Sequence, residues 1–417
     1  MPTIFISAGE ASGELYGAQL ASLLRKTMPQ ATLFGMGGER MRVAGVDCVV
    51  RAEDMAVMGL TEVLEHLPRI YGEFRKLKRA IRERPPQVAV LIDFPDFHFR
   101  LFREFHRLGI PVIYFVSPQL WAWKKHRIKQ VRKYVRRMLV IFPFEEAFYR
   151  EHGVNAEFVG HPLARLAPTS ISRAEFAWAH SLNSAATWIA LLPGSRLREI
   201  RDHLPTMFEA ARRLAERNPA QRFEFLIPLA PTLHAAHLEE VSALVAARTG
   251  ALTIRLIEGP ASEGAPGALS PTAGGARQAL HYARASVVAS GTATVEAALV
   301  GNPFVVVYRV SPITYAIAKR VVDVPHVAMA NLIAGRRVVP ELIQSDFTAA
   351  NIVEHLESLL PDGAHRESMI QGLATVRAAL AAHTDGDGHE GAIDRLATVV
   401  MEELEAARTA PDQSSRT

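Results

Sequence analysis

The chain has 417 residues, of which 49% are hydrophobic and 22% charged, and its formal net charge at pH 7 is +4. This length exceeds that of one ordinary domain and predicts about two domains with large apolar cores. The single cysteine, Cys48, excludes internal disulfides and indicates a reducing compartment.

The first residues, MPTIFISAGE, carry no basic segment followed by a long apolar run, so we do not expect a secretory signal. No uncharged apolar stretch reaches the roughly 18 residues that a spanning helix needs. The positive charge favours an anionic partner, and composition leaves lipid, nucleotide and nucleic acid open. The histidines and the cysteine show no spacing typical of zinc ligands, so we predict no metal site.

Short apolar runs alternate with amphipathic segments through the first half of the chain, the pattern of parallel strands joined by helical crossovers. The predicted strands read TIFIS, TLFGM, VAVLID, PVIYFVS, RMLVIF and AEFVG. The near-continuous apolar character of VAVLID and VIYFV is typical of strands covered on both faces. This half therefore predicts a Rossmann-like domain.

The first predicted strand runs into FISAGEASGELYGAQL, where Gly9, Gly13 and Gly17 are spaced by four residues. A dinucleotide fingerprint would need G-x-G-x-x-G between strand and helix. The order of strand, turn and helix fits that fingerprint, but the glycine spacing does not. Glu10 in this turn either orients a substrate hydroxyl or caps the first helix.

The segment VAVLIDFPDFHFRL places Asp93 and Asp96 just beyond a buried strand. Pro95 disfavours immediate helix continuation and holds both carboxylates near the sheet edge. A partly desolvated carboxylate there is a candidate general base for an alcohol. The structural alternative is that one of them, Asp96 before Asp93, only caps the following helix.

The segment FVSPQLWAWKKHRIKQVRKYVRR contains eight Lys or Arg residues and no acid between Trp121 and Arg137. Three interpretations stay open: a nucleic-acid surface, an anionic lipid surface, and a solvated basic helix whose tryptophans lie in the core. Upstream, MAVMGLTEVLEHL at 55–67 is either core or an exposed contact for acyl chains.

A second series of predicted strands follows the polar, alanine-rich stretch around 165–187, and reads WIALLPG, RFEFLIPL, LTIRLIE, ASVVAS and PFVVVY. It predicts a second Rossmann-like domain that faces the first across a cleft. After about residue 346 the periodicity is helical to about 407, and the remaining tail is expected to be disordered. The Gly-, Ala-, Ser- and Pro-rich segment 259–275 is expected to be a flexible surface loop.

Two strands of this second series run through glycine-containing turns into helices, first Gly194, Ser195 and Arg196, then Ser290, Gly291 and Thr292. Backbone N–H groups at a helix N-terminus form a natural phosphate cradle, and Arg196 would add a cation for a diphosphate. Glu296, about one turn into the second helix, is a candidate acceptor for ribose hydroxyls. The alternative is a pair of ordinary turns capped by Ser and Thr.

Eight motifs occur in a fixed order: SAGEASGE, LIDFPDF, SPQLWAWKKHRIKQV, FPFEEAFY, VGHPL, LLPGSR, SGTATVEAAL and NLIAGRRVVPELIQ. Together they closely resemble the lipid-A-disaccharide synthase family of bacterial glycosyltransferases, over residues 3–345 and more loosely beyond. The resemblance implies a glycosyltransferase-B architecture with Rossmann-like domains at 1–165 and 186–345. It further implies that helices at 346–407 return to the first domain and that 408–417 form the tail.

The resemblance implies transfer of 2,3-diacylglucosamine from its UDP derivative to 2,3-diacylglucosamine 1-phosphate, giving a β-1,6 disaccharide and UDP. A β product from an α-linked donor requires inversion, and hence a base for the acceptor hydroxyl. Asp93 is our first candidate, Asp96 the second, and Glu10 a further catalytic candidate. No metal or other cofactor is expected, because helix N-termini and Arg196 would stabilise the leaving diphosphate.

The resemblance also assigns residues to the two substrates. The glycine-rich turn with Ser12 and Gly13 is similar to an acceptor-side loop, which argues against a dinucleotide site. Glu296 and Asn331 match positions on the nucleotide side of the family. Departures from the family pattern are Phe94 between Asp and Pro, His98 where Asn is common, and Ala330 where Pro is usual.

Because both implied substrates are amphiphilic, we expect a peripheral protein on the cytoplasmic face of the inner membrane of a Gram-negative bacterium. The residues assigned to membrane contact are Met55, Met58, Leu60, Trp121, Trp123, Lys124, Lys125 and Arg127. The resemblance also suggests a homodimer that exchanges C-terminal helices, and no nucleic-acid partner.

Two other hypotheses make different predictions. Another UDP-sugar enzyme of the cell envelope, such as an epimerase or a cell-wall glycosyltransferase, would accept soluble UDP-N-acetylglucosamine. A basic nucleic-acid-binding protein would bind oligonucleotides in a salt-dependent way, but it leaves the paired phosphate cradles unexplained.

Overall fold

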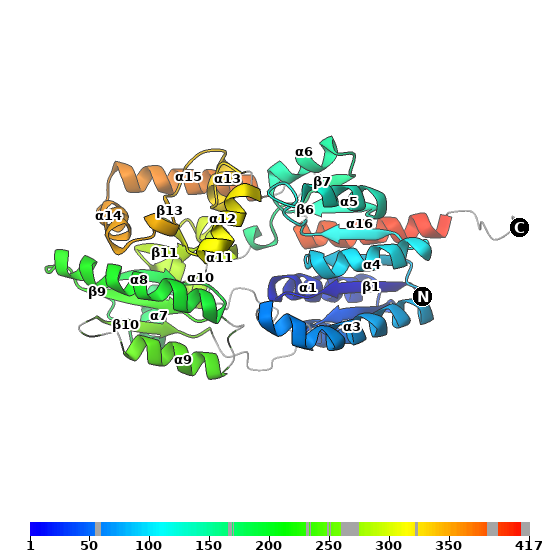
Figure 1. Ribbon diagram of the computed structural model, residues 1–417, viewed down its shortest axis with the longest axis horizontal. Helices are drawn as coiled ribbons and strands as arrows, with labels where there is room; N and C mark the ends of the chain where they lie inside the picture. Colours follow the sequence, from blue (N-terminus) through cyan, green and yellow to red (C-terminus); the bar gives the residue numbers. More distant parts are fainter. Residues whose placement is uncertain are drawn as a thin grey trace, which may run out of the picture. The chain divides into compact units, whose positions relative to one another are not determined.

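The computed structural model divides the chain into two compact units (Figure 1). The first contains Met1–Pro162 and the C-terminal helix, and the second runs from Leu163 to Ala381. The structure describes residues 1–54, 60–165, 169, 171–230, 233, 235–247, 250, 252–259, 275–321, 324–381 and 391–409. The segment around 260–274, expected to be a loop, and the tail beyond 409 lie outside the described residues.

The first unit is built on a seven-stranded parallel sheet with the order β3-β2-β1-β4-β5-β6-β7. Its strands are β1 (Thr3–Ala8), β2 (Thr32–Gly37), β3 (Asp47–Arg51), β4 (Val88–Ile92), β5 (Val112–Phe115), β6 (Arg137–Val140) and β7 (Ala156–Phe158). Its helices are α1 (Ala11–Thr27), α2 (Glu39–Val43), α3 (Leu60–Glu83), α4 (Pro95–Arg107), α5 (Ile128–Tyr134), α6 (Pro143–Glu151) and α16 (Ala392–Thr409). Every residue of β4 is buried, as expected for a central strand covered on both faces.

Apolar side chains pack on both faces of this sheet. One face carries a large aromatic and aliphatic cluster in which α3, α4 and α5 take part through residues such as Leu77, Phe102 and Val131. Alternate strand residues point to the other face, where Tyr16 of α1 meets Phe115 of β5 with ring centroids 5.9 Å apart. Helix α16 packs against α1 and β4.

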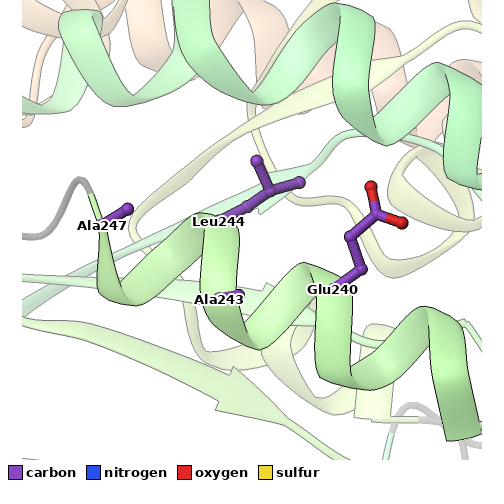
Figure 2. A pocket seen from close by; sticks show the side chains of 4 residues that line it. All are labelled: Glu240, Ala243, Leu244 and Ala247. Atoms are coloured by element: carbon purple, nitrogen blue, oxygen red, sulfur yellow. The ribbon is translucent and has the colours of Figure 1, made fainter.

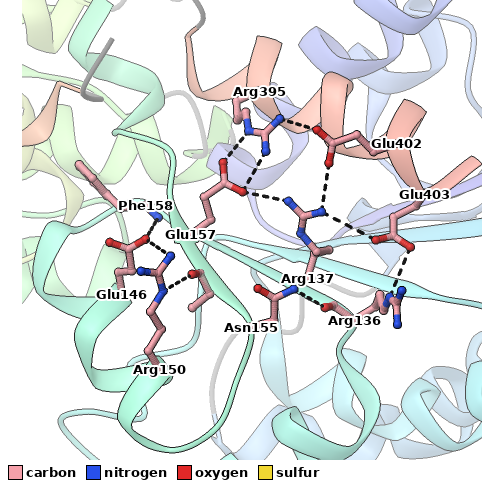
Figure 3. A network of polar contacts seen from close by, with 11 residues as sticks. Arg136, Arg137, Glu146, Arg150, Asn155, Glu157, Phe158, Arg395, Glu402 and Glu403 are labelled. Carbon is pink, nitrogen blue, oxygen red and sulfur yellow. Dashed lines mark hydrogen bonds and ion pairs between the residues drawn. The ribbon is translucent and has the colours of Figure 1, made fainter. Parts of the chain in front are cut away.

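A network of arginine and glutamate side chains joins α16 to the strands β6 and β7 (Figure 3). Arg395 of α16 lies 2.5 Å from a Glu157 oxygen and 2.7 Å from Glu402. Arg137 lies 3.0 Å from both Glu157 and Glu402. Because several partly buried charges share each partner, this network fixes the helix better than isolated surface pairs would.

The second unit has a six-stranded parallel sheet with the order β10-β9-β8-β11-β12-β13. Its strands are β8 (Thr187–Leu192), β9 (Phe223–Pro228), β10 (Ile254–Ile257), β11 (Ala285–Ala289), β12 (Phe304–Tyr308) and β13 (Glu341–Ile343). Its helices are α7 (Arg173–Ala179), α8 (Leu197–Arg217), α9 (Ala235–Ala246), α10 (Gly275–Tyr282), α11 (Thr292–Val300), α12 (Pro312–Val321), α13 (Met329–Ala334), α14 (Ala349–Leu359) and α15 (Ala364–Leu380).

The prediction of two parallel α/β domains is therefore confirmed. The C-terminal helices differ from the expectation that all of 346–407 returns to the first domain, because only α16 belongs to the first unit. Helix α14 packs on α8, β11 and β12, and α15 packs on α11 and α13. Their apolar faces are thus buried within the second unit.

A shallow surface hollow in the second unit is lined by one face of α9, and Figure 2 shows Glu240 and Leu244 extending from that helix. Glu240 accepts two hydrogen bonds from Arg201 of α8, at 2.6 and 2.7 Å. The hollow contains none of the predicted site residues.

Candidate active site

The order of strands in the first sheet creates a switch point between β1 and β4. The chain leaves β1 towards β2 on one side, and leaves β4 towards β5 on the other. In open α/β sheets, ligands bind in the crevice outside the carboxyl ends of such strands. Since Ala8 pairs with Ile92 at these ends, the turns that begin at Gly9 and Asp93 are neighbours. Two motifs separated by more than eighty residues therefore meet at one place.

Asp93 occupies the turn after β4 in an unusual backbone conformation. Asp93 and Phe94 have φ values of 51° and 52°, which place two consecutive non-glycine residues in the left-handed region. Such residues are uncommon, cost of order 1–3 kcal/mol each, and cluster at functional sites. The sequence did not predict this geometry, and Pro95 does not delay the helix as expected, because it is the first residue of α4.

The Asp93 carboxyl is suited to accept a proton near neutral pH. Burial raises the pKa of Asp93 to about 7, and the nearby Glu10 carboxylate adds to the rise. A group with this pKa is a competent general base at physiological pH.

Asp96 has different surroundings. Its side chain is 65% exposed and lies 2.5 Å from Arg127 and 3.5 Å from Lys124. Burial alone would raise the pKa of Asp96, but these two cations outweigh it and hold the pKa below its ordinary value. A carboxylate held in its charged form by two cations is a weak base, so the geometry favours Asp93 over Asp96. Phe94, and not Asp96, takes the N-cap position of α4.

The turn after β1 is shaped by Phe94. A Cβ atom at Gly9 would lie 2.3 Å from the Phe94 ring, so only glycine fits beneath this side chain. Gly13 is buried on α1, but a Cβ there would make ordinary contacts of 3.5 Å, and Ser12 is half-buried beside it. Glu10 is the N-cap residue of α1, and within the described chain its side chain makes no capping hydrogen bond. The capping interpretation of Glu10 is therefore not supported.

The tryptophan-rich segment divides into a fixed part and an exposed part. Trp121 donates a 3.0 Å hydrogen bond to Glu145, which also accepts from Ser117 at 2.6 Å. Burial raises the pKa of Glu145 to about 7 against these hydrogen bonds. These bonds anchor Trp121 to the fold. Trp123 is 42% exposed, and the Lys124 ammonium lies 3.9 Å from the centre of its ring.

The other residues predicted to contact the membrane lie in a short helix, at the start of α3, or outside the described residues. Lys125 and Arg127 lie in a short 3-10 helix, Lys125–Arg127. Met55 and Met58 lie outside the described residues, and Leu60 begins α3. Trp123 and Lys125 are exposed, whereas Lys124 and Arg127 are half-buried and form ion pairs with Asp96.

The second sheet has its own switch point, between β8 and β11. Both glycine-containing turns flank it, since one follows β8 and the other follows β11. Gly194 has a φ of 128°, a conformation that favours glycine. The Arg196 side chain is 77% exposed at the start of α8 and stands 3.7 Å from Glu199.

Glu199 occupies part of the phosphate cradle predicted in the turn after β8. Its carboxylate accepts hydrogen bonds from the backbone N–H groups of Ser195 and Arg196, at 3.1 and 3.4 Å. Two of the N–H groups predicted to hold phosphate are therefore used by the protein's own carboxylate. The capping group is Glu199 instead of the expected Ser or Thr, a role for which acidic residues in the first helical turn are suited.

The turn after β11 is more open. Gly291 has a φ of 149°, and a Cβ there would meet nothing within 4 Å among the described residues. Gly291 is the N-cap of α11 and Ser290 hydrogen bonds through its N–H to Val307. The Thr294 hydroxyl donates to the Gly291 carbonyl at 2.7 Å, while Thr292 is exposed at the helix start. This turn matches the predicted phosphate cradle better than the turn after β8.

Glu296 and Asn331, both predicted on the nucleotide side, have different surroundings. Burial raises the pKa of Glu296, and the Arg277 guanidinium opposes the rise. The Asn331 amide donates to Val339 and Glu341 and accepts from the N–H groups of Val338 and Val339, at 2.7–2.9 Å. Because the protein itself uses this amide fully, the geometry favours a structural role for Asn331 over direct nucleotide contact.

His203, which the sequence did not single out, connects two loops of the second site. Its Nδ1–H donates to the Pro193 carbonyl at 2.6 Å, and its Nε2 accepts from the Arg309 N–H at 3.1 Å. The ring is fully buried and joins the turn after β8 to the residue that follows β12. Only the long-range fold reveals this link, because nothing in the local sequence pairs His203 with Arg309.

Among the described residues, no three His, Cys, Asp or Glu side chains gather as a metal-binding group. No helix within the same residues is long and apolar enough to cross a membrane.

Comparison with known proteins agrees with the sequence motifs. The family model for lipid-A-disaccharide synthetase (LpxB) matches residues 4–384. A lipid-A-disaccharide synthase of Acidobacterium capsulatum is 58% identical over 97% of both chains, and one of Koribacter versatilis is 49% identical over 96% of this chain and 98% of the other.

Solved structures at low sequence identity agree in fold. Staphylococcus aureus MnaA in a co-structure with UDP aligns with a TM-score of 0.62 at 12% identity over 97% of each chain. CalG4, the calicheamicin glycosyltransferase, aligns with a TM-score of 0.56 at 17% identity, over 99% of this chain and all of the other. These likenesses support the glycosyltransferase-B architecture. The chain belongs to the lipid-A-disaccharide synthase family of glycosyltransferases.

Proposed function

We propose that the protein transfers 2,3-diacylglucosamine from its UDP derivative to the 6-hydroxyl of 2,3-diacylglucosamine 1-phosphate. The products are a β-1,6-linked disaccharide 1-phosphate and UDP. Family membership supports the role in lipid A synthesis, and the identity of both substrates is our proposal.

The observation that carries the proposal is the Asp93 carboxyl at the switch point of the first sheet. Its pKa of about 7 suits removal of a proton from a sugar hydroxyl as that oxygen attacks the anomeric carbon. The new C–O bond forms on the face opposite the departing UDP, so the reaction inverts the anomeric centre. The negative charge of Glu10 raises the pKa of Asp93, and we propose that Glu10 accepts a second hydrogen bond from the acceptor sugar.

The donor is assigned to the switch point of the second sheet. As the glycosidic bond breaks, negative charge grows on the diphosphate. We propose that Arg196 and the N–H groups of the turn at Gly291 and Thr292 stabilise that charge, with no metal required. Ser290, Gly194 and Ser195 shape these turns, and Glu296 is proposed to accept the ribose hydroxyls.

We further propose that the protein works at the cytoplasmic face of the inner membrane, where both lipid substrates reside. Trp123 with Lys124 and Lys125 would meet the lipid headgroups, since a tryptophan and neighbouring cations suit an anionic interface. The homodimer suggested by the family resemblance stays a prediction.

The proposal is tested by UDP release from purified protein in detergent micelles. Both diacylated lipids are supplied together, then each is omitted, and the complete reaction is repeated with EDTA. Release that needs both lipids and survives chelation supports the proposal. Conversion of UDP-N-acetylglucosamine to its C2 epimer without net release of UDP would instead indicate an epimerase, and release abolished by EDTA would contradict metal independence.

A further inference from the structure

We propose that His98 is a positioning residue that fixes the backbone of Asp93 and so aims its carboxyl at the acceptor. This inference rests on the base role proposed for Asp93. It concerns three fully buried residues, Ser7, His98 and Tyr114, none of which is among the predicted site residues.

The His98 imidazole links β1 to the turn after β4. Its Nδ1 lies 2.6 Å from the carbonyl oxygen of Asp93, and its Nε2 lies 2.8 Å from the Ser7 hydroxyl. A carbonyl oxygen can only accept, so Nδ1 carries the hydrogen and donates to Asp93. Nε2 of the neutral ring is then an acceptor, and the Ser7 hydroxyl donates to it. One tautomer therefore satisfies all three groups.

Two further bonds hold the backbone of Asp93, one at its carbonyl and one at its N–H. The Tyr114 hydroxyl donates to the Asp93 carbonyl at 2.6 Å, and the Asp93 N–H donates to the Phe115 carbonyl at 2.9 Å. Since left-handed backbone persists in non-glycine residues only when the surroundings over-determine it, these bonds account for the conformation of Asp93 and Phe94. With its backbone fixed, Asp93 has only its side-chain torsions left to vary.

The surroundings keep the ring neutral. Phe94, Phe97 and Tyr114 contact it edge-on, with ring centroids 5.9–6.0 Å away. Burial lowers the pKa of His98 to about 3, against the opposing effect of the bond to Asp93. The titratable groups around this arrangement are Asp93 itself, Tyr114, Tyr149, Asp96 and Glu10. The Nδ1–H donor therefore stays in place over the whole range in which Asp93 titrates.

The test compares two substitutions of His98. His98→Phe keeps a planar ring but removes both hydrogen bonds, and His98→Asn keeps an amide N–H at the position of Nδ1. We expect His98→Phe to lower kcat about tenfold with little change in KM, since small misplacements of a reacting group are costly. The acid limb of its kcat–pH profile should move to lower pH, because a released Asp93 carboxyl gains access to water. His98→Asn should stay within about threefold of the wild type, with an unmoved acid limb.

Other variants make the outcome decisive. Tyr114→Phe removes the second donor, and combining it with His98→Phe should lower kcat by more than the product of the single effects. Ser7→Ala releases only the far side of the ring and should shift the acid limb slightly in the same direction, which keeps the test usable if His98→Phe does not fold. An unmoved acid limb in Ser7→Ala and in His98→Phe where the latter folds, or equal losses in His98→Phe and His98→Asn, would overturn the inference.

Failure of the base role itself is distinguishable from failure of this inference. If Asp93→Asn retains turnover, the base assignment is wrong whatever His98 does. If Asp93→Asn is inactive while His98→Phe keeps the rate and acid limb of the wild type, only the positioning role of His98 is wrong.

Discussion

The two sheets share one strand order around their switch points and yet present opposite chemistry there. In the first unit, the turns hold a half-buried carboxyl, Asp93, whose pKa is raised to about 7. In the second, the turns present an exposed arginine, Arg196, and the open N-cap Gly291. The comparison teaches that topology decides where a ligand binds, while a few side chains at the strand ends decide whether the site removes a proton or receives negative charge.

The largest effect is expected from removing the carboxylate of the first site. Asp93→Asn should lower kcat at least about a hundredfold, because an amide cannot accept the acceptor proton. Affinity for UDP should be unchanged, since we assign the nucleotide to the other unit. Asp96→Asn is the matched control and should retain turnover within a few fold. Equal losses in the two variants would remove the distinction between these carboxylates.

The second-largest effect is expected from removing the positive charge of Arg196 in the second site. Arg196→Gln should lower kcat/KM about 10- to 100-fold, because a preorganised cation facing the developing diphosphate charge is lost. Arg198→Gln is the control, since Arg198 lies two residues further on α8 and is equally exposed. Steady-state kinetics at fixed ionic strength distinguish the two. A similar loss in both variants would point to a general effect of surface charge.

An intermediate effect should follow from filling the space beneath Phe94. Gly9→Ala places a methyl group within 2.3 Å of the Phe94 ring, so the turn after β1 must shift away from Asp93. We expect a loss in kcat of about tenfold, as for other small displacements at reacting groups. Adding Phe94→Ala should restore part of the rate. If the double variant is slower than Gly9→Ala, the steric explanation is wrong.

The smallest effect concerns the carboxylate that occupies the turn after β8. Glu199→Gln keeps an oxygen for the Ser195 N–H group but removes a negative charge near the proposed diphosphate. Affinity for UDP should rise about two- to fivefold, the size expected for a partly exposed charge pair. Calorimetric titration with UDP measures this change, and a lower affinity would show that Glu199 supports the nucleotide site instead of competing with it.

The sequence predicted both parallel sheets, because the alternation of apolar runs with helical segments is a local pattern. It also found Asp93, since a carboxylate directly after a buried strand is visible in the sequence. It did not find the left-handed backbone at Asp93 and Phe94, where hydrogen bonds from His98 and Tyr114 override the extended conformation usual before proline.

Other features could not be read from the sequence because they depend on how a side chain is oriented in the fold, or on which elements pack together. The sequence gives no sign that Glu199 takes the N–H groups of its own turn, or that the four hydrogen bonds of Asn331 leave its amide no free group. Helices α14 and α15 were placed with the wrong unit, since helical periodicity shows which face is apolar but not which partner covers it.

The most direct test of the central claim is the pH dependence of kcat. Asp93 must be ionised to act as a base, so turnover should fall as the pH drops through about 7 and this carboxyl becomes protonated. The residual activity of Asp93→Asn should lack that acid limb. A wild-type profile that is flat between about pH 5.5 and 8, or an acid limb that persists unchanged in Asp93→Asn, would contradict the assignment of Asp93 as the general base.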